Sequence, residues 1–215
     1  MGCRAGEGVG SGARRPLRRV SAARHVVVLT GAGISTPSGI PDFRSPKSGL
    51  WEGVDPEAVA SIWGFRRNPA AFYNWLRPLA RLVVEAEPNP AHRALAALEQ
   101  AGQVRAVVTQ NIDGLHQKAG SRRVLELHGD LRHATCLRCA HQAATAPLLD
   151  VFLATGDIPR CSRCAGVLKP NVVLFGELLP EDVLSEAERE ARNCDLMWVV
   201  GSSLSVAPAS LLPLE

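Results

Sequence analysis

Short runs of apolar residues alternate with longer segments of mixed polarity along most of this chain. The runs are rich in β-branched side chains and fall at residues 25–30, 104–108, 124–127, 172–175 and 196–200. Runs of this length and composition are typical of buried parallel strands. The pattern therefore predicts five strands, all belonging to one parallel sheet.

Two of the intervening segments begin as helices do, with asparagine followed by proline. Asn68-Pro69 precedes Phe72 and further apolar residues at helical spacing, and Asn89-Pro90 opens a second helix. Asparagine caps a helix N-terminus, and proline fits its first turn. A third, charged helix is expected over 181–192. This alternation predicts an α/β fold, a Rossmann-type parallel sheet with helices on both faces.

Residues 130–169 break the alternation and carry four of the six cysteines. They form two Cys-x-x-Cys pairs, Cys136 with Cys139 and Cys161 with Cys164. Each spacing brings two thiolates to one metal ion, and two pairs complete a closed tetrahedral zinc site. Because a closed site has no open coordination position, we expect a structural Zn²⁺ in a small inserted domain. Redox pairs or buried free thiols are the alternative.

Polar residues gather directly after the predicted strands. The clusters are Thr30–Ser35, Gln110–Asp113, His128, Gly176-Glu177 and Gly201–Ser203. Because ligands of open parallel sheets bind at the carboxyl ends of the strands, these clusters predict one large site.

Three of these clusters have both a chemical and a structural interpretation. Residues 31–35 (GAGIS) follow a strand and suit a phosphate cradle before a helix, although a tight turn has the same pattern. His128 is placed as a general base, but a hydrogen-bonded structural histidine is the alternative. Asn111 and Asp113 present an amide and a carboxylate, or cap a helix.

Composition and charge narrow the class of protein. The 215 residues are 46% apolar and 21% charged, as in a globular protein. The net charge of +3 is concentrated in residues 1–25, with six arginines and one glutamate, so the remaining chain is close to neutral. We therefore expect no direct nucleic-acid partner. No apolar run approaches the ~18 residues of a bilayer span, so no membrane partner is expected either.

The same arginines define the expected terminus and location. Residues 1–24 are predicted to form a disordered basic N-terminus, since they offer little to bury. The cysteine pattern favours a reducing compartment, and we expect a cytoplasmic protein. An organellar matrix is the alternative, because transit peptides are also rich in arginine.

Together, the motifs closely resemble those of the sirtuins, which are NAD-dependent protein lysine deacylases. The resemblance runs in unbroken order from about residue 25 to the end. The residues that carry it are 31–35 (GAGIS), 39–44 (GIPDFR), 109–113 (TQNID), His128-Gly129, the four cysteines, 175–177 (FGE) and 201–203 (GSS).

The resemblance implies an enzyme that transfers the acyl group of acyl-lysine, in an acetylated protein or peptide, to ADP-ribose with release of nicotinamide. NAD is then a co-substrate. The implied cofactor-binding residues are Gly31, Ala32, Gly33, Ser35, Asp42, Phe43, Arg44, Gln110, Asn111, Ile112, Asp113, Gly201, Ser202 and Ser203.

His128 and Asn111 are the implied catalytic residues, with His128 removing a proton from a ribose hydroxyl. The implied substrate-binding residues are Tyr73, Val173, Phe175, Gly176 and Glu177. The segment 172–177 is expected to pair along the backbone of the substrate peptide.

The resemblance also implies a division into domains. An NAD-binding domain would comprise 25–128 and 170–215, with the zinc-binding domain at 129–169. Sirtuins usually continue beyond the point at which this chain stops, so we expect a truncation on the adenine side. A catalytically impaired relative that binds acyl-lysine or a partner is the alternative function. An ordinary NAD dehydrogenase is disfavoured, because Thr36 stands at the third glycine position.

One pair of residues bears on the acyl group. Sirtuins that prefer succinyl-lysine resemble one another in a Tyr-x-x-Arg pair beside the acyl channel. Here Tyr73 is followed by Leu76 at the arginine position. Arg77 lies one residue later, about 100° further around the helix. The resemblance therefore implies a preference for acetyl-lysine.

Overall fold

The computed structural model describes residues 23–43, 45 and 49–215. The predicted N-terminal segment 1–24, apart from its last two residues, and the predicted cofactor-binding residue Arg44 lie outside these ranges. Within them, no helix has both the length and the apolar character needed to cross a membrane.

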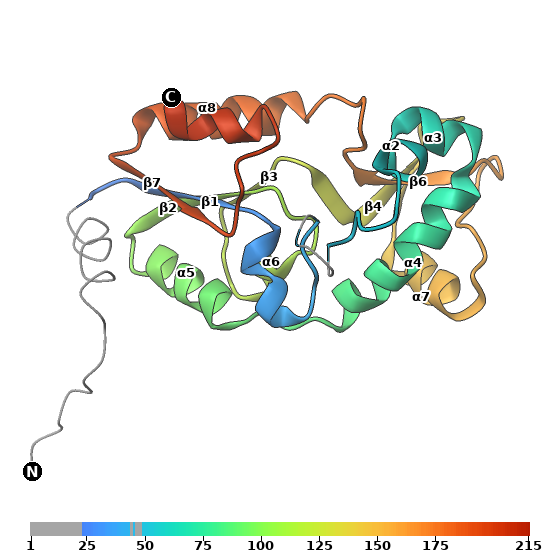
Figure 1. The fold of residues 1–215 in the computed structure, drawn as a ribbon, viewed down its shortest axis with the longest axis horizontal. Helices are drawn as coiled ribbons and strands as arrows, with labels where there is room; N and C mark the ends of the chain where they lie inside the picture. The colour runs from blue at the N-terminus through green and yellow to red at the C-terminus, as the bar shows by residue number, and fades with distance from the viewer. Residues whose placement is uncertain (1–22, 44, 46–48) are drawn as a thin grey trace, which may run out of the picture.

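A four-stranded parallel sheet forms the larger half of the molecule (Figure 1). Its order is β3 (Val124–Glu126), β2 (Val104–Thr109), β1 (Val26–Thr30) and β7 (Leu196–Val200). Thr30 pairs with Thr109 on one side and with Val200 on the other, so three strands end at the same edge. All five residues of β1 are buried, as expected for the central strand of a sheet covered on both faces.

The side chains of β1 alternate between two helical layers. Val27 and Leu29 face one layer, whereas Val26 and Val28 face the other. The first layer is α8 (Glu181–Asn193) with the 3-10 helix η3 (Ala209–Leu214), and the second is α5 (Pro90–Gln100). Figure 1 shows α8 above the sheet and α5 below it. The prediction of a parallel sheet with helices on both faces is confirmed.

A second, antiparallel sheet lies beside the first. Its order is β5 (Gln142–Ala144), β4 (Gly129–Cys136) and β6 (Leu168–Val172), and α7 (Ala146–Thr155) follows β5. The helices α2 (Pro56–Ala60), α3 (Ile62–Arg67) and α4 (Pro69–Glu85) lie on this side of the molecule (Figure 1). Residues of α3, α4, α7 and β4 share one apolar core. The predicted domain division stays a prediction, and β6 crosses its boundary at 169/170.

The predicted strand at 172–175 is wrong. The strand is β6, which ends at Val172 and pairs antiparallel with β4 instead of joining the parallel sheet. Residues 173–175 leave the sheet, and Phe175 forms a single bridge with Ser61. The run is apolar because its side chains line a cavity.

Candidate active site

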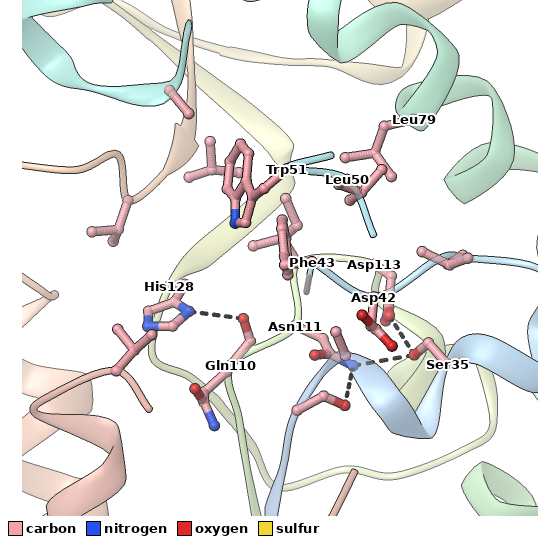
Figure 2. A pocket seen from close by; sticks show the side chains of 18 of the residues that line it. Ser35, Asp42, Phe43, Leu50, Trp51, Leu79, Gln110, Asn111, Asp113 and His128 are labelled. Carbon is pink, nitrogen blue, oxygen red and sulfur yellow. Dashed lines mark hydrogen bonds between the residues drawn. The ribbon is translucent and has the colours of Figure 1, made fainter. Parts of the chain in front are cut away.

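A cavity of about 750 Å³ opens where the parallel strands end, between them and α4. It is lined by every predicted cofactor, catalytic and substrate residue that the structure describes, with the exception of Tyr73. Figure 2 shows polar side chains along one wall, among them Ser35, Asn111 and His128, and the larger apolar side chains Trp51 and Leu79 along the other. The prediction that the polar clusters converge on one site is confirmed.

The glycines after β1 allow two turns to pack together. Gly33 N donates to Gly201 O across 2.9 Å, and a Cβ on Gly33 would lie 2.9 Å from that same oxygen. The expected α-helix after this turn is absent from the described chain, which forms two 3-10 helices, η1 (Ala32–Ile34) and η2 (Thr36–Ser38). The glycines are therefore explained by the close approach of β7, not by a helix N-terminus.

Ser35 is the centre of a buried hydrogen-bond network. Its hydroxyl donates to Asp113 Oδ2 across 2.7 Å and accepts from Asn111 Nδ2 across 3.1 Å. Asn111 Nδ2 also donates to Gly31 O, which leaves Oδ1 as the polar atom of this amide that turns away from Ser35 (Figure 2). Asp113 Oδ1 accepts from the N–H of Leu115. The carboxylate and the amide are thus held in fixed orientations.

Two buried histidines lie behind this network. His92 Nε2 lies 3.5 Å from Ser35 Oγ, and the ring of His92 packs edge-on against that of His116, with centroids 4.9 Å apart. Thr30 Oγ1 donates to Thr109 and therefore accepts from His116 Nε2. Burial lowers the pKa of His92 and lowers that of His116 to about 3, so both rings are neutral. Their role is to support Ser35 and the end of β1.

His128 lines the cavity, and one of its ring nitrogens is hydrogen-bonded within the protein. Its Nδ1 lies 2.9 Å from the backbone oxygen of Gln110. A dashed line marks this contact in Figure 2. A carbonyl only accepts hydrogen bonds, so Nδ1 carries the proton and Nε2 is the unprotonated nitrogen. Burial lowers the pKa of His128 below its ordinary value of 6.5, outweighing the opposite effect of the Gln110 hydrogen bond. At neutral pH this histidine is therefore a base with a free lone pair.

Aromatic side chains form the opposite wall. Trp51 stacks on Phe43 and on Trp75, in each case with ring centroids 5.2 Å apart. Leu76 and Leu79 of α4 extend this apolar wall. Sequence reasoning assigned a site role to Phe43 but missed Trp51 and Trp75. Helical periodicity marked Trp75 as a buried position, whereas nothing in the sequence placed Trp51.

The structure places Tyr73, a predicted substrate-binding residue, outside the lining of the cavity. Its side chain is buried, and its hydroxyl donates to Leu168 O of β6 across 2.6 Å. Burial also raises the pKa of Tyr73 above its ordinary range. Tyr73 therefore joins α4 to the second sheet and does not line the cavity. The neighbouring Arg77 donates to Leu153 O of α7, which directs its charge away from the cavity as well.

The four paired cysteines form one cluster at the end of β4, where Cys136 is the last residue of the strand and the other three lie in loops. Their sulfur atoms all lie within 4.8 Å of one another. The two knuckles have the same backbone geometry: Ala140 N donates to Cys136 O and Ala165 N to Cys161 O, and both alanines have positive φ. A Cβ on Gly166 would lie 3.0 Å from Cys136 Sγ.

Four thiols on two such knuckles, without a bulky neighbour between them, fit a tetrahedral Zn²⁺. Four thiolates complete the tetrahedral coordination of such an ion and leave no position for a substrate. None of the four cysteines lines the cavity. The role of the cluster is therefore structural.

Comparison with known proteins shows which family has this sequence and fold. The model of the Sir2 family matches residues 31–208. NAD-dependent protein deacylase 2 of Archaeoglobus fulgidus is 52% identical over 201 residues, which are 93% of this chain and 78% of the relative. NAD-dependent protein deacetylase 1 of Geobacillus kaustophilus is 47% identical over 195 residues, which are 91% of this chain and 78% of that protein.

Solved structures agree with these relatives. A Sir2 enzyme described in a study of the mechanism and regulation of Sir2 enzymes superposes with a TM-score of 0.87 at 51% identity, covering 94% of this chain and 79% of that one. A Sir2 protein with a deacetylated p53 peptide and 3′-O-acetyl ADP-ribose gives a TM-score of 0.87 at 43% identity, covering 94% and 80%.

With this fold, cavity and cysteine cluster, and with these relatives, the chain falls in the class of NAD-dependent protein deacylases and deacetylases. Within that class, the chain belongs to the Sir2 family.

Proposed function

We propose that this protein removes acyl groups from lysine side chains, with His128 as the general base and the cavity holding NAD and acyl-lysine together. One observation carries the assignment. The Nδ1–H of His128 is held by Gln110 O, which leaves Nε2 as a base at the wall shared with Asn111 and Asp113. A histidine whose pKa is lowered by burial suits a proton transfer near neutral pH.

The polar wall suits NAD. Asn111 Oδ1 is an acceptor for a ribose hydroxyl, and Gln110, whose Nε2 donates to Ser202, is fixed next to it. Asp42 and Asp113 bring negative charge to the cavity, and no Lys or Arg lines it within the described ranges. That charge balance stabilises the cationic nicotinamide ring and the positive charge that develops as it leaves. NAD supplies the electrophilic ribose carbon and the nicotinamide leaving group.

The reaction balances with one water. Acyl-lysine, NAD and water give free lysine, acyl-ADP-ribose and nicotinamide. Two bonds break, the ribose C–N bond to nicotinamide and the amide C–N bond. The former amide oxygen replaces nicotinamide on the ribose carbon, the acyl carbon becomes bonded to a neighbouring ribose hydroxyl oxygen, and water supplies the new carbonyl oxygen. His128 Nε2 accepts the proton from that hydroxyl, which makes its oxygen nucleophilic. Ser35 and Asn111 contribute by orientation, because their hydrogen bonds hold the acceptor atoms at the wall.

Acyl-lysine is proposed to enter along residues 173–176. Val173 N donates to His128 O across 2.8 Å, which places this segment directly beside the base. Val173 and Phe175 give the entrance apolar side chains, and the aromatic wall of Phe43, Trp51 and Trp75 suits the butyl stem and a neutral acyl group. An acetylated peptide is therefore the substrate class that the cavity favours.

An assay of NAD with an acetyl-lysine peptide tests the proposal. We expect nicotinamide, free lysine peptide and acetyl-ADP-ribose to form in equal amounts. Mass spectrometry measures all three products. Formation of nicotinamide without loss of the acetyl group would instead make the protein an NAD hydrolase. Peptide binding without any turnover would favour the binding protein considered above. The expected cytoplasmic location remains a proposal, and cell fractionation would test it.

A further inference from the structure

Lys169 is a buried cation outside the catalytic constellation. Only 7% of the residue is exposed, although lysine rarely lies in a protein interior. Its Nζ donates to Pro170 O across 3.1 Å and to Val172 O across 2.9 Å, and it lies 3.0 Å from Glu177 Oε2. An ammonium group has three hydrogens, and these three acceptors satisfy all of them.

Glu177 lines the cavity, but its carboxylate binds groups of the protein itself. Oε2 accepts from Leu174 N across 2.9 Å in addition to pairing with Lys169. The backbone N–H of Glu177 in turn donates to Leu174 O across 3.0 Å. The predicted role of Glu177 in contacting substrate directly therefore finds no support in these contacts. The carboxylate closes residues 174–177 into a tight loop and ties that loop to β6.

The loop is anchored at several further points. Val173 N donates to His128 O, while Phe175 N donates to Ala60 O and Phe175 O accepts from Ile62 N. Among the described residues, the carbonyl of Val173 and the N–H of Gly176 have no protein partner. Gly176 has φ +83°, and a Cβ there would lie 2.1 Å from the ring of Trp63, so this backbone is held close against α3.

We propose that the ion pair of Lys169 and Glu177 is a positioning device for the substrate peptide. Fixing Leu174 N–H inward turns the loop so that Val173 O and Gly176 N–H form a short edge for the peptide backbone, next to His128. This inference rests on the proposed function for the nature of the substrate. It assigns Lys169 and Glu177 as positioning residues, since neither touches the reacting atoms.

The test compares binding of peptide with binding of NAD. Glu177→Gln keeps the shape of the side chain and removes its charge, whereas Lys169→Met removes the cation and keeps much of the stem. For each variant we expect the KM for an acetyl-lysine peptide to rise about tenfold or more, with the KM for NAD changed less than about twofold. The double variant should be no worse than either single variant, because the pair acts as one unit.

A matched control is the exposed ion pair of Lys118 and Glu87, whose atoms lie 2.8 Å apart away from the cavity. Glu87→Gln should leave both KM values unchanged. If Lys169→Met fails to fold, Glu177→Asp serves instead, since it keeps the charge but withdraws the carboxylate by one methylene. Circular dichroism establishes which variants are folded.

The outcomes separate this inference from the proposed function. Direct titration with a fluorescent acetyl-lysine peptide measures the Kd for the peptide and needs no turnover. If the wild type binds the peptide but is inactive, the proposed function is refuted, whereas the positioning role can still be tested by comparing Kd values. An unchanged peptide Kd in folded Glu177→Gln or Glu177→Asp would overturn the positioning role. An equal loss of affinity for peptide and NAD would also overturn it, because that result would mean a general loss of structure.

Discussion

Ser35 donates to Asp113 Oδ2 across 2.7 Å and thereby joins the turn after β1 to the turn after β2. The Ser35 hydroxyl donates its only hydrogen to the carboxylate of Asp113. Its two lone pairs therefore accept hydrogen bonds, from Asn111 Nδ2 and from His92 Nε2. One small side chain therefore sets the orientation of an amide, a carboxylate and an imidazole. The polar wall of the cavity is organised before any ligand binds.

Ser35→Ala removes the acceptor of two buried donors and the donor to Asp113. We expect the free energy of unfolding to fall by about 1–3 kcal/mol, because buried groups lose their partners. The KM for NAD should rise about tenfold or more, since the Asn111 amide loses one of the two hydrogen bonds that orient it. Urea unfolding and NAD titration measure the two effects. Ser38→Ala is the control, because Ser38 contacts Asn89 outside the cavity. Similar losses in both variants would argue against a special role for Ser35.

His128→Ala should lower deacylation about 10²- to 10⁴-fold, the usual contribution of a general base. Exchange of labelled nicotinamide into NAD should be affected less, because nicotinamide leaves before the ribose hydroxyl is deprotonated. His133→Ala, at an exposed site in β4, is a control of the same residue type. Equal loss of both reactions would mean that His128 orients NAD and does not act as the base.

The pH dependence follows from the burial of His128. A base must be neutral to work, and burial lowers its pKa below 6.5. The midpoint of the loss of activity on acidification, where half of Nε2 is protonated, should therefore lie below pH 6.5. The measurement is kcat/KM for the peptide between about pH 5 and about pH 8. A midpoint above pH 6.5 would contradict the assignment.

The acyl group is predicted to be small and neutral. Leu76 lines the cavity at the position where an arginine would pair with a carboxylate, and no cation lines it in the described part of the chain. Burying an unpaired carboxylate costs several kcal/mol. We expect kcat/KM for acetyl-lysine to exceed that for succinyl-lysine by about 100-fold or more, since about 1.4 kcal/mol corresponds to a factor of ten.

Leu76→Arg tests the cause of that preference. The added guanidinium should raise activity on succinyl-lysine and lower it on acetyl-lysine. Leu82→Arg adds the same charge on an exposed part of the same helix and should change neither. Efficient removal of succinyl groups by the unaltered protein would mean that another cation reaches the acyl group.

Zinc is expected at one ion per chain. Removal by a chelator should unfold the second sheet, because Cys136 belongs to β4 and the cluster ties that strand to the loop of Cys161 and Cys164. Activity should disappear along with the structure. Elemental analysis and circular dichroism provide the measurements. Cys139→Ala should lose the metal, whereas Cys194→Ala, outside the cluster, should retain it. Folded, active protein without zinc would refute the assignment.

Much of the fold could be predicted from short apolar runs. The strands β1, β2, β3 and β7 begin and end within one residue of the predicted runs. They could be found because β-branched residues buried on both faces have few other arrangements. The site followed from the same strands, since parallel strands that end together bring their polar residues together.

The predictions made from the sequence differ from the structure where tertiary contacts determine the position of a residue. The apolar run at 172–175 has the composition of a strand, but its side chains line the cavity, and the true strand begins at Leu168. Tyr73 lies on a helix that is buried on two sides, against the cavity and against the second sheet. Periodicity marks such a residue as buried without showing which neighbour it contacts. Trp51 follows a loop and has no periodic signal at all.

The stack of Trp51 on Trp75 gives the protein an optical property. The two indole rings are almost parallel, at an interplanar angle of 7°. Trp63, a third of the four tryptophans, lies against Gly176 at the cavity wall. Three of the four tryptophans therefore lie at the cavity or against its wall, and we expect the coupled transitions of the stacked pair to add to the near-ultraviolet circular dichroism. A ligand that binds in the cavity lies against these rings, so we expect both the intrinsic fluorescence and this dichroism to change with occupancy and to report binding without a label.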